Sequence, residues 1–268
     1  MRPGERRFSI GVDGAKLAAL SLEPPGSSGR GKRPTLVFLH EGLGCIATWR
    51  DVPHELVTAT GCPGLVYDRR GHGRSDPLAT PHGFRYMHDE AARLPRILDA
   101  CGIDRGLLIG HSDGGSIALM AAASAPERVL AVITEGAHVF VEPESIAGIR
   151  ATTDAFAATD LRRRLMRHHG AGTDALFRAW SDVWLGTAFR RWNIEEVLPA
   201  IRCPLLVIQG TEDEYGTPAQ VDAICRQTGG EATPRLIPDC GHAPHHQARK
   251  VTLAAMTRFI RRLVEDVS

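Results

Sequence analysis

The chain has 268 residues, 43% of them hydrophobic, which is enough for one large domain with a single core. Its 32 Lys and Arg against 31 Asp and Glu leave a net charge of +1, which gives no reason to expect nucleic acid or another polyanion as a partner. No run of about 18 apolar residues occurs, and no apolar core follows the basic N-terminus, so we expect a cytoplasmic protein that is neither exported nor bound in a membrane.

Six cysteines are spread along the chain without paired spacing, and we expect free thiols, as is usual in a reducing cytosol. His242 and His246 have the spacing H-x-x-x-H, but the glutamate of a zinc-binding H-E-x-x-H motif is missing between them. We therefore expect no metal site and no cofactor.

In chain order, residues 8–12 and 16–22 are predicted to be two edge strands joined by the turn dipeptide Asp13-Gly14. Residues 23–33 are rich in Pro, Gly and Ser and are predicted to form a loop. Residues 35–39 form a continuous apolar run, as expected for a strand buried on both faces of a parallel sheet.

Strands and helices then alternate, which favours right-handed crossovers and a mostly parallel sheet. The predicted elements are a helix from about residue 48, a strand at 64–68, a helix at 88–100 and strands at 105–109 and 129–134.

From about residue 140 to 199 the alternation stops and only helices are predicted. Thr173 can cap a helix that ends at Gly186, and Asn193 can cap another. Alternation resumes with a strand at 204–209, a helix at 218–227, a strand at 234–237 and a helix at 246–264. We therefore predict a core in two parts, residues 1–139 and 200–268, and a helical lid insertion, residues 140–199.

Ser112 lies in the segment Gly110-His-Ser-Asp-Gly114, between a predicted strand and a predicted helix. G-x-S-x-G at such a junction is the pattern of a sharp turn that lifts a serine above a sheet, with glycines that allow close packing. Asp213 and His242 each follow a later strand. Because the carboxyl ends of parallel strands meet at one edge, we expect the three side chains to converge.

The chain resembles the α/β-hydrolase superfamily in five motifs that stand in the order of that family. They are His40-Glu-Gly-Leu-Gly44, Asp68-Arg-Arg-Gly-His-Gly-Arg-Ser75, Gly110-His-Ser-Asp-Gly114, Gly210-Thr-Glu-Asp213 and Gly241-His242. The Ser-Asp-Gly-Gly segment with a helical lid looks most like the serine esterases that include the valacyclovir hydrolases, and bacterial carboxylesterases share much of it. The family often has His-Gly-x-Gly in the first motif, whereas Glu41 takes the second position here.

The resemblance implies an α/β-hydrolase fold and a catalytic triad on it. Ser112 would be the nucleophile, His242 its general base, and Asp213 the carboxylate that orients the imidazole. Glu135, Glu212 and Glu214 remain alternatives for the acid.

A developing oxyanion needs preorganised donors, for which we expect the backbone N–H groups of Asp113 and Gly42, with Leu43 as the alternative to Gly42. We expect His40 and residues 69–75 to shape the loops around the pocket rather than to react.

Phe177, Trp180 and Trp184 share one face of a predicted helix, as packing onto the main domain or as an apolar wall over a pocket. We keep Trp180 and Trp184 as candidate substrate contacts. Asp113 has two interpretations. The resemblance implies that it recognises a substrate amino group, whereas the helix start would also favour a carboxylate bonded to local backbone N–H groups.

These features predict a serine hydrolase that cleaves a small or medium carboxylic ester through an acyl-serine intermediate. Hydrolysis of amides, thioesters or C–C bonds and acyl transfer remain open on the same triad, as does a small-molecule receptor without turnover. Ser112 argues against halide or epoxide chemistry, which in this fold normally uses an aspartate at that position. The sequence does not decide between a monomer and a homo-oligomer.

Overall fold

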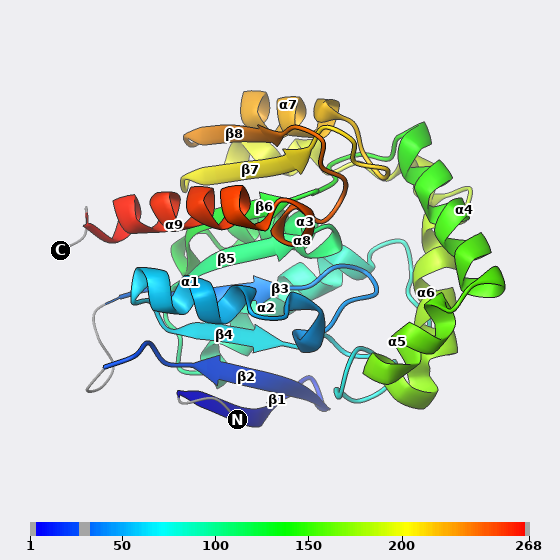
Figure 1. Ribbon diagram of the computed structural model, residues 1–268, viewed down its shortest axis with the longest axis horizontal. Coiled ribbons are helices and arrows are strands. Elements are labelled where there is room, and N and C mark those ends of the chain that lie inside the picture. Colours follow the sequence, from blue (N-terminus) through cyan, green and yellow to red (C-terminus); the bar gives the residue numbers. More distant parts are fainter. Residues whose placement is uncertain (1–3, 27–32, 266–268) are drawn as a thin grey trace.

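The computed structural model describes residues 4–26 and 33–265. Most of the loop predicted at residues 23–33 lies outside the described residues, as do the first three residues of the basic N-terminus. The described residues form an eight-stranded sheet with helices on both faces (Figure 1). None of the helices in this part of the chain is long and apolar enough to cross a membrane.

The chain begins with an antiparallel hairpin of β1 (Glu5–Val12) and β2 (Ala15–Leu22). Its turn residues Asp13 and Gly14 both have positive φ, 53° and 70°, which suits the right-handed twist of the strands. The prediction of two edge strands was wrong for β2, which also pairs with β4 (Gly64–Tyr67). The reason is that β2 buries apolar side chains on both faces, Leu17 in one core and Leu20 in the other.

The sheet has the strand order β1-β2-β4-β3-β5-β6-β7-β8, and every pair from β4 onward is parallel. The remaining strands are β3 (Thr35–Leu39), β5 (Gly106–His111), β6 (Val129–Glu135), β7 (Leu205–Gly210) and β8 (Ala232–Ile237). The predicted fold class, a mostly parallel sheet flanked by helices, is confirmed.

The two faces of the sheet carry two separate cores. In β3, Leu36 and Phe38 belong to the core beneath α1 (Val52–Thr60) and α9 (Arg249–Glu265), while Val37 and Leu39 belong to the other. That second core is covered by α2 (Tyr86–Ala100), α3 (Asp113–Ser124) and α7 (Pro218–Gln227). A short helix, α8 (Pro244–Gln247), precedes α9.

The helix expected from residue 48 begins later. Residues Ile46–Trp49 form a 3-10 turn, and α1 starts at Val52. The Asp68 carboxylate accepts the Ile46 N–H at 2.6 Å, which fixes the turn ahead of the helix.

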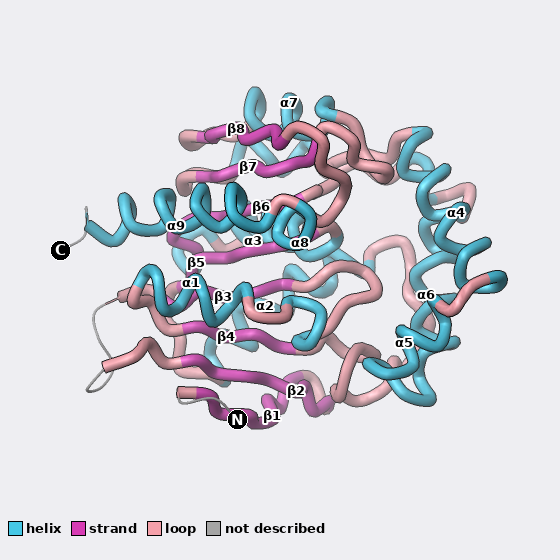
Figure 2. The backbone as a smooth tube through the Cα atoms, viewed as in Figure 1, coloured by secondary structure: helices cyan, strands magenta, loops and turns pink. Residues whose placement is uncertain are grey.

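Between β6 and β7 lie three further helices, α4 (Pro143–Ala158), α5 (Leu161–His169) and α6 (Thr173–Leu185). We call residues 140–199 the helical insertion. It lies on the side to which the parallel strands point (Figure 1), and the loops that follow those strands separate it from the sheet (Figure 2). Its beginning lies beside residues close to its end, because Phe140 and Asn193 form an isolated bridge and Ile194 N–H donates to Val139 O at 2.7 Å.

Within the helical insertion, Phe177, Trp180 and Trp184 are all buried, on the shared face that their spacing predicts. Thr173 is the first residue of α6 rather than its cap, because its hydroxyl instead donates to Gly170 O at 2.8 Å. Asn193 accepts the Glu195 N–H at 2.7 Å and so starts the 3-10 helix Glu195–Ala200.

Candidate active site

Ser112 occupies a strained turn between β5 and α3. Its φ of 53° and ψ of −120° are rarely adopted by a residue with a side chain. The flanking glycines allow the turn, since a Cβ on Gly114 would lie 2.0 Å from Leu39 O and one on Gly110 would lie 2.2 Å from Gly114 O. The serine therefore stands at the end of β5 with the first turn of α3 packed against β3.

His242 and Asp213 come from the loops after β8 and β7 and contact each other directly. The His242 Nδ1 lies 2.8 Å from Asp213 Oδ1 and 2.9 Å from Oδ2. Burial alone would raise the pKa of Asp213, but the hydrogen bond and charge of His242, with the Tyr215 N–H, hold it below its usual range. Asp213 is therefore ionised and in direct contact with the imidazole.

Two of the alternative acids are engaged elsewhere. Glu135 forms a buried ion pair with His245, with 2.8 Å between Oε2 and the ring Nδ1. Glu214 accepts the backbone N–H of His242 at 3.1 Å and so positions the loop rather than the ring. Glu212 is exposed. The geometry favours Asp213 among the four.

Gly136, directly after β6, was missed by the sequence reasoning. It has a φ of 55°, and a Cβ there would lie 2.9 Å from the His242 ring and 3.3 Å from Asp213 Oδ2. Because Gly136 has no side chain, the His242 ring and the Asp213 carboxylate can lie directly against its backbone. A glycine immediately after a predicted strand was the available signal.

Ser112 and His242 line one cavity of about 100 Å³ beneath the helical insertion. The residues around it come from the strand ends and from α4 and α6: Glu41, Gly42, Leu43, Ser112, Asp113, His138, Ser145, Ile149, Thr152, Trp180, Trp184, Tyr215 and His242.

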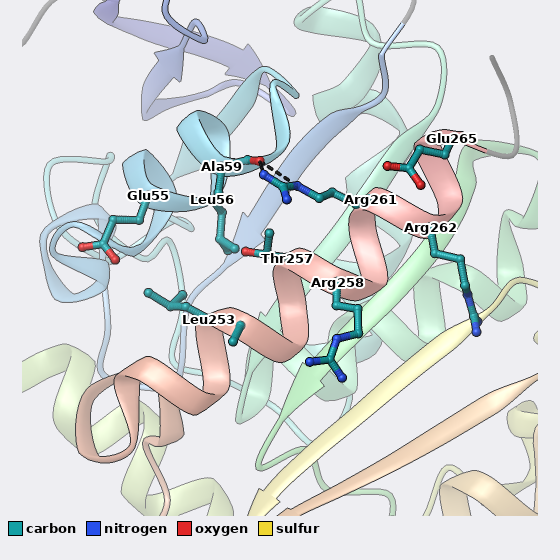
Figure 3. A pocket seen from close by; sticks show the side chains of 10 residues that line it. Glu55, Leu56, Ala59, Leu253, Thr257, Arg258, Arg261, Arg262 and Glu265 are labelled. Carbon is teal, nitrogen blue, oxygen red and sulfur yellow. Dashed lines mark hydrogen bonds between the residues drawn. The ribbon is translucent and has the colours of Figure 1, made fainter.

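A larger groove of about 650 Å³ runs between α1 and α9 (Figure 3). There Arg261 reaches from α9 to Ala59 O of α1, at 2.7 and 3.0 Å. Its lining contains none of the predicted catalytic residues, so the smaller cavity is the candidate active site. In the described residues, no group of three or more His, Cys, Asp and Glu side chains could hold a metal ion.

In the loop after β3, the peptide group between Glu41 and Gly42 is fixed by several hydrogen bonds. The carbonyl of Glu41 accepts hydrogen bonds from His40 Nδ1 at 2.8 Å, Arg69 Nη2 at 2.9 Å and the Gly44 N–H at 3.1 Å. Because the N–H of a trans peptide points opposite to its carbonyl, this fixes the direction of the Gly42 N–H. That N–H has no acceptor within the described residues. The direction of the Gly42 N–H, the donor predicted for an oxyanion, is therefore set by the partners of Glu41 O.

Buried neutral histidines support the same loop. Burial and the nearby Arg69 charge hold the pKa of His40 well below its usual value. Burial, and then the charges of His40 and Arg69, hold the pKa of His72 well below its usual value, and its Nε2 lies 3.1 Å from Gly42 O. These contacts agree with the expectation that His40 and His72 shape the loop.

Glu41, the departure from the family pattern, faces a histidine that the sequence reasoning missed. Its Oε2 lies 3.6 Å from Nδ1 of His111, the residue before Ser112. Burial would lower the pKa of His111, but the Glu41 and Glu135 carboxylates raise it to about 9. The charged ring also donates from Nε2 to His242 O at 2.8 Å. The pair thus joins three loops around the site.

Asp113 is 1% exposed, and its bonds are not those of a helix cap. Its Oδ2 accepts the Tyr86 hydroxyl at 2.7 Å, and that hydroxyl in turn accepts Trp184 Nε1 at 2.9 Å. Its Oδ1 is buried without a hydrogen-bond partner among the described residues. Burial raises the pKa of this carboxyl, as expected for an unsatisfied acid.

The predicted contacts Trp180 and Trp184 both line the cavity. Trp180 packs directly on the loop after β3, since a Cβ at Gly42 would lie 2.3 Å from its Nε1.

A family model described as the alpha/beta hydrolase fold matches residues 34–196. The chain is 32% identical to the polyketide synthase ThaQ of Burkholderia thailandensis over 88% of its own length, but it spans only 12% of that protein. It is 26% identical to a 2-succinyl-6-hydroxy-2,4-cyclohexadiene-1-carboxylate synthase of Enterobacter, over 87% of this chain and 94% of that one. The serine hydrolase BPHL of Mus musculus is 24% identical over 68% of this chain and 63% of that protein.

Many solved structures share the architecture, among them the following two. The proline iminopeptidase of Mycobacterium smegmatis superposes with a TM-score of 0.78 at 18% identity, over 98% of this chain and 100% of that one. An esterase of Thermogutta terrifontis gives a TM-score of 0.70 at 20% identity, over 97% and 99%. At these identities the likeness concerns the fold alone.

Proposed function

This chain belongs to the α/β-hydrolase fold family, and from that premise we propose that it is a serine hydrolase that cleaves a small or medium carboxylic ester. One observation carries the proposal: His242, bonded to the buried Asp213, lines the same small cavity as the strained Ser112. A nucleophile, a base and an orienting carboxylate are the parts that acyl transfer through serine needs.

The proposed reaction has two halves. Ser112 Oγ attacks the ester carbonyl carbon while His242 takes the hydroxyl proton, and Asp213 stabilises the imidazolium. The C–O bond to the alcohol then breaks, and His242 returns the proton to the departing alkoxide. Water attacks the acyl-serine by the same route, which releases the carboxylic acid and restores the Ser112 hydroxyl.

Negative charge on the carbonyl oxygen would be received by the backbone N–H groups of Gly42 and Asp113. The Glu41 carbonyl, held by three donors, supports this role because its partners fix the Gly42 N–H and polarise the peptide. Loss of one such donor typically costs about 3 kcal/mol of transition-state stabilisation.

We propose further that the helical insertion acts as a lid. A cavity of about 100 Å³ is smaller than the roughly 300–1,000 Å³ of typical small-molecule sites. Trp180 and Trp184 close it from α6, so substrate entry requires α6 to move away from the strand ends.

Asp113 supports a preference for esters whose acyl part carries an amino group. Its Oδ1 is a buried acceptor without a partner, next to the nucleophile, and a bound ammonium group would supply both a donor and the counter-charge. Tyr86 and Trp184 hold the carboxylate in one orientation from the other side.

A reaction other than ester hydrolysis on the same serine is the second candidate. It is favoured by the 26% identity, over nearly the full length of both chains, to a protein named as a carboxylate synthase. A receptor without turnover is a further alternative.

We keep the cytoplasm as the proposed location.

The test is a panel of chromogenic esters of different acyl length and charge, with matched thioesters and anilides, run with wild type and Ser112→Ala. We expect turnover of esters that is lost in Ser112→Ala. Tight ligand binding with no Ser112-dependent turnover of any compound would favour the receptor. Turnover of thioesters or anilides alone would replace the ester by that compound as the proposed substrate class.

A further inference from the structure

Three histidines contact the loop after β3. Each of them lies beside the backbone carbonyl of a different residue, and the three carbonyls belong to successive residues. His40 Nδ1 donates to Glu41 O at 2.8 Å, His72 Nε2 lies 3.1 Å from Gly42 O, and His169 Nε2 donates to Leu43 O at 2.9 Å. The first two belong to the core of the fold. The third is the last residue of α5, in the helical insertion, 126 residues further along the chain.

His169 also holds a second loop of the core. Its Nδ1 accepts the Gly73 N–H at 2.9 Å, so the proton of the ring must sit on Nε2, where it is donated to Leu43 O. The ring is 7% exposed, and burial lowers its pKa, which keeps it neutral. One neutral imidazole thus bridges the two core loops.

The two partners of His169 differ in how firmly they are held. A Cβ on Gly73 would lie 2.0 Å from Asp68 Oδ2, and the same oxygen accepts the Arg74 N–H at 2.9 Å. The Gly73 side is therefore fixed by the core. On the other side, the carbonyl of Leu43 accepts its hydrogen bond from His169.

The turn at Leu43 directly supports the proposed oxyanion donor. The peptide that carries Leu43 O also carries the Gly44 N–H, which donates to Glu41 O at 3.1 Å. Pulling Leu43 O toward His169 therefore aims the Gly44 N–H at the peptide of Gly42, because the two groups of a trans peptide point in opposite directions. Trp180, also from the helical insertion, packs on Gly42 itself.

We propose that His169 is a positioning residue that completes the oxyanion loop only when the helical insertion is seated on the core. The inference rests on the proposed hydrolase function. The cavity of about 100 Å³ is smaller than a typical substrate site, so under the proposed lid movement the bond from His169 to Leu43 O breaks and re-forms in each cycle. Closure and activation are then one event.

A pair of substitutions separates the two bonds of His169. In His169→Gln the side-chain amide can still reach Leu43 O as a donor, whereas in His169→Asn the amide oxygen can serve Gly73 N–H while the donor to Leu43 is lost. We expect His169→Asn to lower kcat about tenfold with KM within twofold, and to weaken a phenylboronic acid, which mimics the tetrahedral state, by the same factor. His169→Gln should lose at most about threefold.

The neighbouring His168→Asn is the matched control and should match wild type in kcat. Equal kcat in wild type and both His169 variants, or equal losses in both, would overturn the inference. The His169 variants are compared only by the turnover that is lost in Ser112→Ala. If Ser112→Ala changes nothing, the hydrolase proposal fails, and that result is distinct from a failure of the His169 inference.

A measurement on the unmodified protein adds a test that needs no variant. Hydrogen exchange of the Gly44 amide should follow that of the α5 amides, and both should slow together when Ser112 is blocked by a fluorophosphonate. If the Gly44 amide exchanges independently of α5, the loop is ordered without the insertion and the inference is wrong.

Discussion

Glu41 and His111 form an ion pair beside the candidate nucleophile, with 3.6 Å between the carboxylate Oε2 and the ring Nδ1. The pair joins the loop after β3 to the end of β5, and its histidine also donates to His242 O. Three segments that meet only in the folded chain are thereby linked through one charged imidazole.

The first prediction concerns the pH dependence of this pair. Because the folded pKa of His111 is raised to about 9, its contribution to stability is full below its unfolded value of about 6.5 and is lost as pH rises through 9. Glu41→Gln should therefore lower the free energy of unfolding by up to roughly 3 kcal/mol at pH 6, and by little at pH 10. Thermal unfolding at both pH values measures the difference.

Asp174→Asn is the control, because it breaks the exposed ion pair between Asp174 and Arg162 on the helical insertion. Exposed pairs contribute about 0–1 kcal/mol, so this variant should shift stability little at either pH. A Glu41→Gln effect of the same size at pH 6 and pH 10 would contradict the assignment of the charge to His111.

The second prediction is that Asp213→Asn lowers kcat by about 10³–10⁴-fold, since an amide can present its N–H to the imidazole and favour the wrong tautomer. Steady-state kinetics on the best ester of the panel measures it. Glu214→Gln, which keeps an acceptor for the His242 backbone N–H, should stay within about tenfold of wild type. Wild-type kcat in Asp213→Asn would reassign the acid.

The third prediction concerns Gly136. Gly136→Ala places a methyl group 2.9 Å from the His242 ring at a φ of 55°, so we expect a loss of about 1–3 kcal/mol in stability and a clear fall in kcat. Gly102→Ala is the matched control, with a φ of 66° and no atom within 4 Å of the added Cβ. Because of the backbone strain, Gly102→Ala should lower the melting temperature while kcat stays unchanged. If both variants kept kcat, the tight fit around His242 would have no catalytic consequence.

The fourth prediction is a change of selectivity in Asp113→Asn. The ratio of kcat/KM for an aminoacyl ester to that for its N-acetylated form should fall by about 10–100-fold, because a charged hydrogen bond contributes about 1.5–3 kcal/mol. The N-acetylated ester keeps the amino-acid side chain and the ester bond but carries no positive charge. An unchanged ratio would return Asp113 to a structural role with Tyr86.

The strands of the sheet could be predicted because burial on both faces leaves a direct mark in the sequence. In β3, alternate residues serve two different cores, so the whole run is apolar and its position is clear. The same logic placed Ser112, Asp213 and His242 at strand ends. It failed for β2, whose pairing with β4 joins residues far apart in the chain.

The contacts that position the loop after β3 could not be predicted. Periodicity indicates which side of α5 is buried, but it does not tell which core atom His169 meets. The same holds for Glu41 and His111, whose pairing depends on how two neighbouring strands end. Such polar pairs follow from the packed fold and not from any local pattern.

The bridge between Phe140 and Asn193 has a consequence for engineering and for divergence. Since the bridge holds Phe140 beside Asn193, the length and composition of the chain between them can change without moving these two points. Residues 141–192 are therefore a replaceable cassette. A graft from another chain should support the proposed reaction provided that it returns one imidazole to the place of His169.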